Sequence, residues 1–208
     1  MPRILHIHAS PRPDSYSWRL ARAFLDAYLQ AHPGTGCELL DLWEADLPAF
    51  DAPAAGAKYS VMHALEPRDE QAKVWRRVGE IIEHFKSAEM YAFSSPMWNF
   101  SIPYRLKQYI DILVQPGLTF TQTMTKGYQG LVTGRPAVLL LARGGAYPSG
   151  TDSAQYDMQR PYLETILRYI GITDIRTVAV EQTLAGPDVS ERNLKAAIEQ
   201  ARKLAAEM

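Results

Sequence analysis

Short apolar segments alternate with longer amphipathic segments along this chain of 208 residues. Each apolar segment has six or seven residues and ends at polar or turn-forming residues, which is typical of a buried strand. The expected strands are residues 3–9, 37–42, 89–94, 137–142 and 175–180. Apolar residues at helical spacing follow each strand, and the expected helices are residues 17–31, 68–87, 103–113, 162–169 and 190–207.

This alternation predicts an α/β fold with one parallel sheet that is covered by helices on both faces. Residues 137–142, AVLLLA, are apolar throughout, as expected for a strand buried on both faces. Five strands in a chain of this length favour the doubly wound order 2-1-3-4-5. We therefore expect a single domain, 1–208, whose loops after the first, third and fourth strands meet in one crevice. Residues 43–67 show no clear period, and we expect an irregular excursion there.

The composition argues against several other classes of protein. The 22 Lys and Arg residues balance 23 Asp and Glu residues without forming a basic block, which disfavours a nucleic-acid partner. No apolar stretch approaches the roughly 20 residues of a membrane span, and residues 1–6 do not resemble a secretory signal. Cys37 is the only cysteine, so no intrachain disulfide is possible and the cytoplasm is the expected compartment. We expect Cys37 to be a small buried residue.

The loop after the first expected strand is rich in serine. Ser10, Ser15 and Ser17 precede or open the first helix, and Ser17 is the expected N-cap. A helix N-terminus presents free N–H groups and partial positive charge, which together suit a phosphate. The glycine and lysine pattern of a P-loop is absent, and so is a G-x-G-x-x-G motif. An ordinary serine-rich turn is an equally good interpretation of this loop alone.

The loop after the third expected strand combines proline, aromatic and amide side chains. Pro96 and Pro103 restrict its backbone, and Trp98 and Phe100 flank Asn99. Aromatic faces together with an amide suit a flat heteroaromatic ligand. Simple packing of this loop against the following helix is the alternative.

The loop after the fourth expected strand contains a pair of glycines. Gly144 and Gly145 allow the backbone to approach a ligand closely, and Arg143 is a candidate partner for the electron-rich edge of a ring. A glycine pair alone is weak evidence. Taken together, the three loops offer a phosphate end, a ring face and a ring edge in one place.

The chain resembles the FMN-dependent NADH azoreductases, flavodoxin-like proteins that are also described as NAD(P)H:quinone oxidoreductases. The resemblance covers nearly the whole chain and depends on six segments. These are Ser10 with residues 15–17, and residues 96–100, 118–120, 130–134, 143–145 and 169–172. Trp98 stands where the family commonly has Tyr, and Ala142 where it commonly has Ser. The backbone contacts at these two positions are expected to persist.

The resemblance implies a tightly bound FMN and a set of residues that hold it. The residues implied for the phosphate are Ser10, Ser15, Tyr16 and Ser17. Those implied for the isoalloxazine are Pro96, Met97, Trp98, Asn99 and Phe100, with Ala142, Arg143, Gly144 and Gly145 beside its pyrimidine edge. No catalytic side chain is implied, because the flavin carries the redox chemistry.

The resemblance also implies a ping-pong cycle in a cytoplasmic homodimer. NADH or NADPH reduces the flavin and leaves, and a quinone, azo dye or nitroaromatic compound then takes two electrons at the same ring face. In this family the active site lies at the subunit boundary. Phe120 is therefore a candidate for stacking on the substrate and Tyr147 a weaker one, with plain interface packing as the alternative.

The alternatives to an enzyme are an electron carrier and a non-enzymatic flavin-binding module, and a metal site is the alternative kind of site. A flavodoxin-type electron carrier would use the same fold, but such carriers tend to be acidic, whereas this chain has a net charge of −1. A non-enzymatic flavin-binding module would fit equally well. His6 and His8 alternate on the first strand, but no nearby carboxylate cluster supports a metal site, so we expect packed, hydrogen-bonded side chains.

Overall fold

The computed structural model describes residues 3–123, 125 and 127–208, so Met1 and Pro2 of the N-terminal segment lie outside the described residues. Its main sheet has five parallel strands in the order β2-β1-β3-β6-β7. They are β1 (Arg3–His8), β2 (Gly36–Asp41), β3 (Met90–Pro96), β6 (Ala137–Ala142) and β7 (Ile175–Val180). This order is the predicted order 2-1-3-4-5, and all six residues of β6 are buried.

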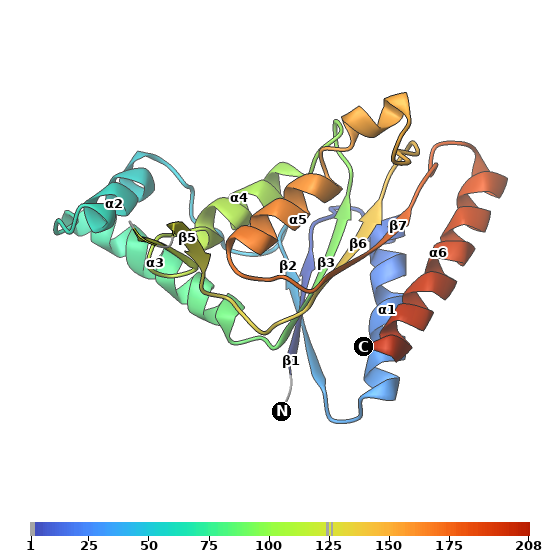
Figure 1. The fold of residues 1–208 in the computed structure, drawn as a ribbon, viewed down its shortest axis with the longest axis horizontal. Helices are drawn as coiled ribbons and strands as arrows, with labels where there is room; N and C mark the ends of the chain where they lie inside the picture. Colours follow the sequence, from blue (N-terminus) through green and yellow to red (C-terminus); the bar gives the residue numbers. More distant parts are fainter. Residues whose placement is uncertain (1–2, 124, 126) are drawn as a thin grey trace.

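Helices cover both faces of this sheet (Figure 1). On one face, α1 (Tyr16–Ala31) and α6 (Pro187–Glu207) enclose a core that includes Phe24 and Val138. On the other face, α3 (Asp69–Lys86), α4 (Tyr104–Leu113) and α5 (Arg160–Tyr169) pack over a second core around Tyr91 and Leu139. The doubly wound architecture predicted from the sequence is therefore confirmed.

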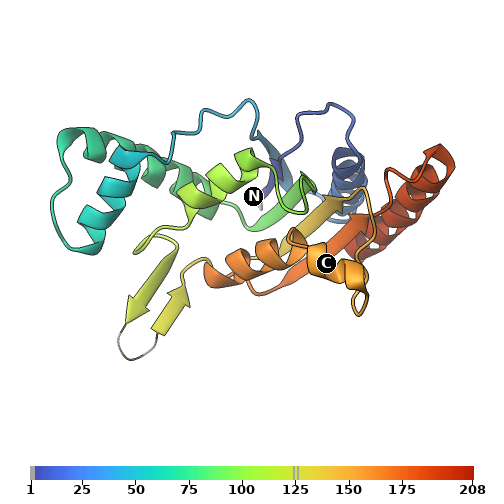
Figure 2. The same ribbon diagram turned by 90° about the horizontal axis from the view of Figure 1, so that it is seen from above.

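The structure contains elements that the sequence pattern did not predict. The segment 43–67 was expected to be irregular, but it contains α2 (Ala52–Met62), whose first turn is capped by the side chain of Asp51. An antiparallel hairpin of β4 (Phe120–Thr123) and β5 (Gly127–Gly130) projects from the body of the molecule, and α2 lies beside α3 at one end (Figure 2). A short 3₁₀ helix, η1 (Asp152–Tyr156), precedes α5.

Three local expectations were wrong. Ser15, not Ser17, caps α1, because its hydroxyl accepts a hydrogen bond from the N–H of Trp18. Helix α6 begins at Pro187 instead of Ser190, whose hydroxyl donates to the carbonyl of Pro187. Cys37 is exposed, because β2 is an edge strand that the helices leave largely open. Within the described residues, no helix is both long and apolar enough to cross a membrane.

Candidate functional site

The loops after β1, β3 and β6 lie together at the carboxyl edge of the sheet. These strands are neighbours, and backbone hydrogen bonds continue beyond their ends. The N–H of Ala9 donates to the carbonyl of Ser94 at 2.9 Å, and the N–H of Met97 donates to the carbonyl of Ala142 at 2.8 Å. The three loops singled out from the sequence therefore leave adjacent strands next to the switch point of the sheet, and the space that they border is the expected crevice.

Hydrogen-bond donors line the first of these loops. Ser10, Ser15 and Ser17 are all at least 95% buried, and the hydroxyls of Ser15 and Ser17 lie 3.3 Å apart. The first N–H groups of a helix have no partner inside the helix. In α1 the side chain of Ser15 accepts from Trp18, which leaves the N–H groups of Tyr16 and Ser17 without a partner among the described residues. Because the first turn also lacks an acidic residue, this helix end suits an anion.

A buried polar cluster supports this loop from below. The hydroxyl of Ser94 lies 2.8 Å from His6 Nε2 and 2.7 Å from His8 Nδ1. Burial and the neighbouring His8 lower the pKa of His6 to about 3, and burial lowers the pKa of His8 although Asp41 opposes it. Both imidazoles are therefore neutral near pH 7. A neutral imidazole has one donor and one acceptor nitrogen, so each ring can either donate to the hydroxyl of Ser94 or accept from it. This confirms the expectation of packed, hydrogen-bonded histidines.

The loop after β3 forms a tight turn that presents aromatic rings. Trp98 and Ser101 exchange two backbone hydrogen bonds of 2.9 Å, and the two residues between them, Asn99 and Phe100, have φ values of 47° and 69°. Two successive positive φ values characterise a type I′ turn, and a bulky residue rarely adopts this conformation. Strained backbone of this kind is concentrated at functional sites. The turn leaves 36% of Trp98 and 46% of Phe100 exposed.

Two further aromatic residues extend this surface. The ring of Trp43 lies 5.8 Å from that of Trp98 and 5.3 Å from that of Tyr104, measured between centroids. Trp43 also borders a cavity of about 480 Å³ that includes Ser10 and Trp18. Sequence analysis missed Trp43 because it lies in the segment without a period, and missed Tyr104 because it opens a helix.

The turn after β6 is fixed by its own arginine. The side chain of Arg143 is 4% exposed, and its Nη1 lies 2.8 Å from Asp157 Oδ2 and 3.3 Å from Glu181 Oε1. Nη1 and Nε of the guanidinium are therefore paired within the protein, whereas the buried Nη2 has no hydrogen-bond partner among the described residues. A Cβ on Gly144 would lie 2.7 Å from the side chain of Leu184, which is 85% exposed, so a larger residue here would displace that side chain.

The two candidate substrate residues lie in different places. Tyr147 is half-buried beside the Arg143 turn, with its ring centroid 5.9 Å from the guanidinium. Phe120 is 9% exposed at the base of the hairpin, and its ring packs 4.9 Å from that of Tyr169. Tyr169 ends α5, which returns from the carboxyl edge to the amino edge of the sheet. The structure therefore does not bring Phe120 to the crevice of its own chain.

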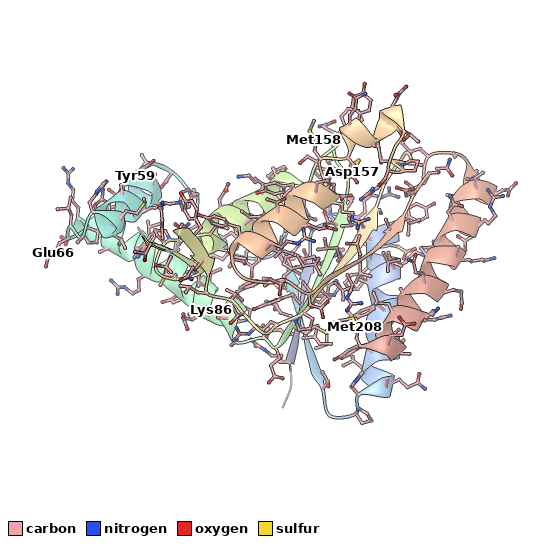
Figure 3. All side chains as sticks on the ribbon, viewed as in Figure 1. Tyr59, Glu66, Lys86, Asp157, Met158 and Met208 are labelled. Atoms are coloured by element: carbon pink, nitrogen blue, oxygen red, sulfur yellow. The ribbon has the colours of Figure 1, made fainter. Side chains whose placement is uncertain are left out.

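Sequence analysis also missed the segment just before α5. Gln159 is fully buried and bonds to both Ser95 and Arg143, and the N–H of Met158 donates to the carbonyl of Phe100 at 3.0 Å. Figure 3 labels Asp157 and Met158 in this segment, near the carboxyl ends of β3 and β6. Asp157 and Gln159 show no recognisable sequence spacing, because their hydrogen-bond partners in the neighbouring loops are distant in the sequence.

Comparisons with known proteins agree with this architecture. A family model described as a flavodoxin-like fold matches residues 2–205. A protein of Nitratidesulfovibrio vulgaris named FMN-dependent NADH:quinone oxidoreductase is 51% identical over 211 residues, which cover 100% of both chains. A protein of the same name from Desulfotalea psychrophila is 44% identical and covers 100% of this chain and 98% of its own.

Solved structures give the same result. An azoreductase from Bacillus anthracis superposes with a TM-score of 0.91 at 31% identity, and each chain is covered completely. An FMN-dependent NADH-azoreductase of the same species, solved in complex with FMN, has a TM-score of 0.87 at 27% identity, with 99% of this chain and 98% of that one covered.

The fold and the arrangement of these loops define a doubly wound α/β protein whose switch point lies between β1 and β3. With the matches to its full length, the chain belongs to the flavodoxin-like family, and within it to the group of these NADH:quinone oxidoreductases and azoreductases.

Proposed function

We propose that this protein is an FMN-dependent oxidoreductase that passes two electrons from NADH to quinones and azo compounds. The observation that carries the proposal is the meeting of three loops at the carboxyl edge: a donor-lined helix end, a strained aromatic turn and a glycine turn. Relatives named FMN-dependent NADH:quinone oxidoreductase, up to 51% identical, support the same activity.

The first loop fits the phosphate of FMN. This loop supplies uncharged hydrogen-bond donors: the hydroxyls of Ser10, Ser15 and Ser17 and the N–H groups of Tyr16 and Ser17. They complement a phosphate, whose oxygens are acceptors. The dipole of α1 adds partial positive charge without a fixed cation. Charge-assisted hydrogen bonds of this kind are about twice as strong as neutral ones.

The second and third loops fit the isoalloxazine ring. Pro96, Met97 and the turn from Trp98 to Phe100 supply apolar faces and the amide of Asn99. Nη1 and Nε of Arg143 are already paired, so its unpartnered Nη2 and the backbone of residues 142–145 are the groups left for the ring edge. FMN, when bound, supplies the two-electron redox chemistry, and these residues orient it and exclude water from one side.

A second copy of the chain completes the site in this proposal. Phe120 is distant from the crevice of its own chain but lies at the base of a projecting hairpin, beside the exposed Tyr128. A homodimer would place this aromatic group over the partner's crevice, where Phe120 and Tyr147 would contact the nicotinamide and then the aromatic acceptor. Donor and acceptor then use one position in turn, which is a ping-pong mechanism. We place the enzyme in the cytoplasm.

Two measurements test this function. The apoprotein titrated with FMN should quench flavin fluorescence and give a bound-flavin spectrum at micromolar concentration. Under anaerobic conditions the holoenzyme should oxidise one equivalent of NADH per flavin by itself and turn NADH over continuously only when a quinone or an azo dye is present. Double-reciprocal plots at several acceptor concentrations should be parallel. FMN binding without NADH turnover would indicate an electron carrier, and the absence of FMN binding would refute the proposal.

A further inference from the structure

The segment Tyr156–Gln159 joins the two loops to which we assign the flavin ring. On the side of β3, the N–H of Met158 donates to the carbonyl of Phe100 at 3.0 Å, and the rings of Tyr156 and Phe100 lie 5.1 Å apart between centroids. On the side of β6, Asp157 and Gln159 both bond to the side chain of Arg143. The two loops also meet directly, because the N–H of Met97 donates to the carbonyl of Ala142 at 2.8 Å.

Gln159 uses both ends of its amide in this link. Its Nε2 donates to the carbonyl of Ser95 at 3.3 Å, and its Oε1 accepts from Nε of Arg143 at 3.3 Å. The residue is 0% exposed, so it bridges the ends of β3 and β6 from inside the protein without reaching solvent. The amide supplies both the donor and the acceptor that these two partners require.

Asp157 connects the same network to α5. Its Oδ2 pairs with Arg143, while its Oδ1 accepts from the N–H groups of Gln159 and Arg160, both at 3.1 Å. One carboxylate thus fixes the start of α5 and the guanidinium together. Buried networks in which the groups are hydrogen-bonded to one another restrain a structure to one arrangement.

We propose that Gln159 is a positioning residue that sets the separation between the Trp98–Ser101 turn and the Arg143–Gly145 turn, with Asp157 as its support. Because Gln159 is fully buried, it acts through these two turns and not by touching a ligand. This inference rests on the proposed function, since the space between the turns is the one we assign to the flavin ring.

The test replaces the amide and compares it with a matched buried glutamine. Gln159→Met removes both hydrogen bonds at similar side-chain volume. Gln115→Met is the control, because Gln115 is also 0% exposed and donates through Nε2 to a carbonyl, that of Asp111, but contacts neither turn. We expect Gln159→Met to weaken FMN about fivefold or more and to change the visible circular dichroism of the bound flavin. Gln115→Met should leave both flavin signals unchanged.

A second variant covers the case in which Gln159→Met does not fold. Asp157→Asn keeps an oxygen for the N–H groups of α5 but removes the charge that holds Arg143, and it should shift the same flavin signals. Wild-type flavin signals in both variants, or equal changes in Gln115→Met, would overturn the inference.

A readout that needs no flavin separates this inference from the proposed function. In the apoprotein, amide hydrogen exchange of residues 97–103 should be faster in Gln159→Met than in wild type or in Gln115→Met. If the wild-type protein binds no FMN, the proposed function fails. The amide hydrogen exchange of residues 97–103 in the apoprotein then still tests whether Gln159 links the two turns. Unchanged exchange would refute the link itself.

Discussion

Arg143 and Asp157 form an ion pair beneath the crevice, with 2.8 Å between Nη1 and Oδ2 and with 4% and 11% of the two side chains exposed. Removing one partner of a buried pair leaves an uncompensated charge and costs about 3–5 kcal/mol. Since Glu181 remains as a second acceptor, we expect Asp157→Ala to cost about 3 kcal/mol of unfolding free energy in urea titrations.

The matched control is an exposed pair of the same residue types. Arg176 and Asp174 are 54% and 52% exposed, and solvent screens such pairs so that they contribute little to stability. Asp174→Ala should therefore change the unfolding midpoint little. Equal losses of unfolding free energy in Asp157→Ala and Asp174→Ala would show that the buried Arg143 pair stabilises the protein no more than an exposed pair does.

Ser17→Ala tests the phosphate loop without removing the helix cap. Ser17 is fully buried beside Ser15, whereas Ser15 caps α1. We expect Ser17→Ala to weaken FMN by about 1–3 kcal/mol through the lost hydrogen bond to a charged oxygen, with an unchanged unfolding midpoint of the apoprotein. Ser15→Ala should weaken FMN and also cost about 1 kcal/mol of stability. Unchanged FMN affinity in Ser17→Ala, by fluorescence titration, would remove this hydroxyl from the site.

The buried histidines predict an acid-dependent loss of stability. The pKa of His6 falls from 6.5 to about 3 on folding because of burial and the neighbouring His8. Between these values the unfolded chain binds a proton that the folded chain does not. The contribution of His6 to the free energy of unfolding is therefore fully present above pH 6.5. It decreases by up to about 1.4 kcal/mol per pH unit as the pH falls toward 3.

Urea unfolding at pH 7.5, 5.5 and 4.5 measures this slope. His6→Gln keeps a hydrogen-bonding side chain beside Ser94 but does not titrate, so its stability should depend less on pH. His63→Gln, at an exposed position, should keep the wild-type slope. The assignment to His6 fails if the slope of His6→Gln equals that of wild type.

Two glycines should respond in opposite ways to the same substitution. A Cβ on Gly130 would lie 2.1 Å from the backbone nitrogen of Gly171, where the hairpin packs on the end of α5. Gly130→Ala should therefore cost about 1–3 kcal/mol or more, because backbone cannot move aside easily. Gly79 lies within α3, and a Cβ there would meet nothing within 4 Å. Gly79→Ala should stabilise the protein by about 0.5–1 kcal/mol. Thermal unfolding of both variants checks the two signs.

The sequence alone determined the sheet and the positions of the three loops. Apolar runs such as AVLLLA and the one-sided apolar pattern of α1 or α3 are local, so they can be read without knowing the partners they pack against. The strand count then favoured one sheet order, and that order placed residues 10–17, 96–100 and 143–145 at one edge. Helix α2 was not predicted, because its apolar residues do not gather on one side. The hairpin was not predicted, because the sequence GYQG of β5 shows no apolar alternation.

Only the tertiary structure decided how these loops are held. The pairing of Arg143 with Asp157 and Glu181 and the bridge of Gln159 to Ser95 join residues from 14 to 64 positions apart, and no local period encodes such contacts. The same holds for Phe120, which the family resemblance assigned to the site but which lies on a hairpin that projects from the body of the molecule. Local patterns specify which face of an element is buried, whereas the partner of a buried polar group depends on which segments the fold brings together.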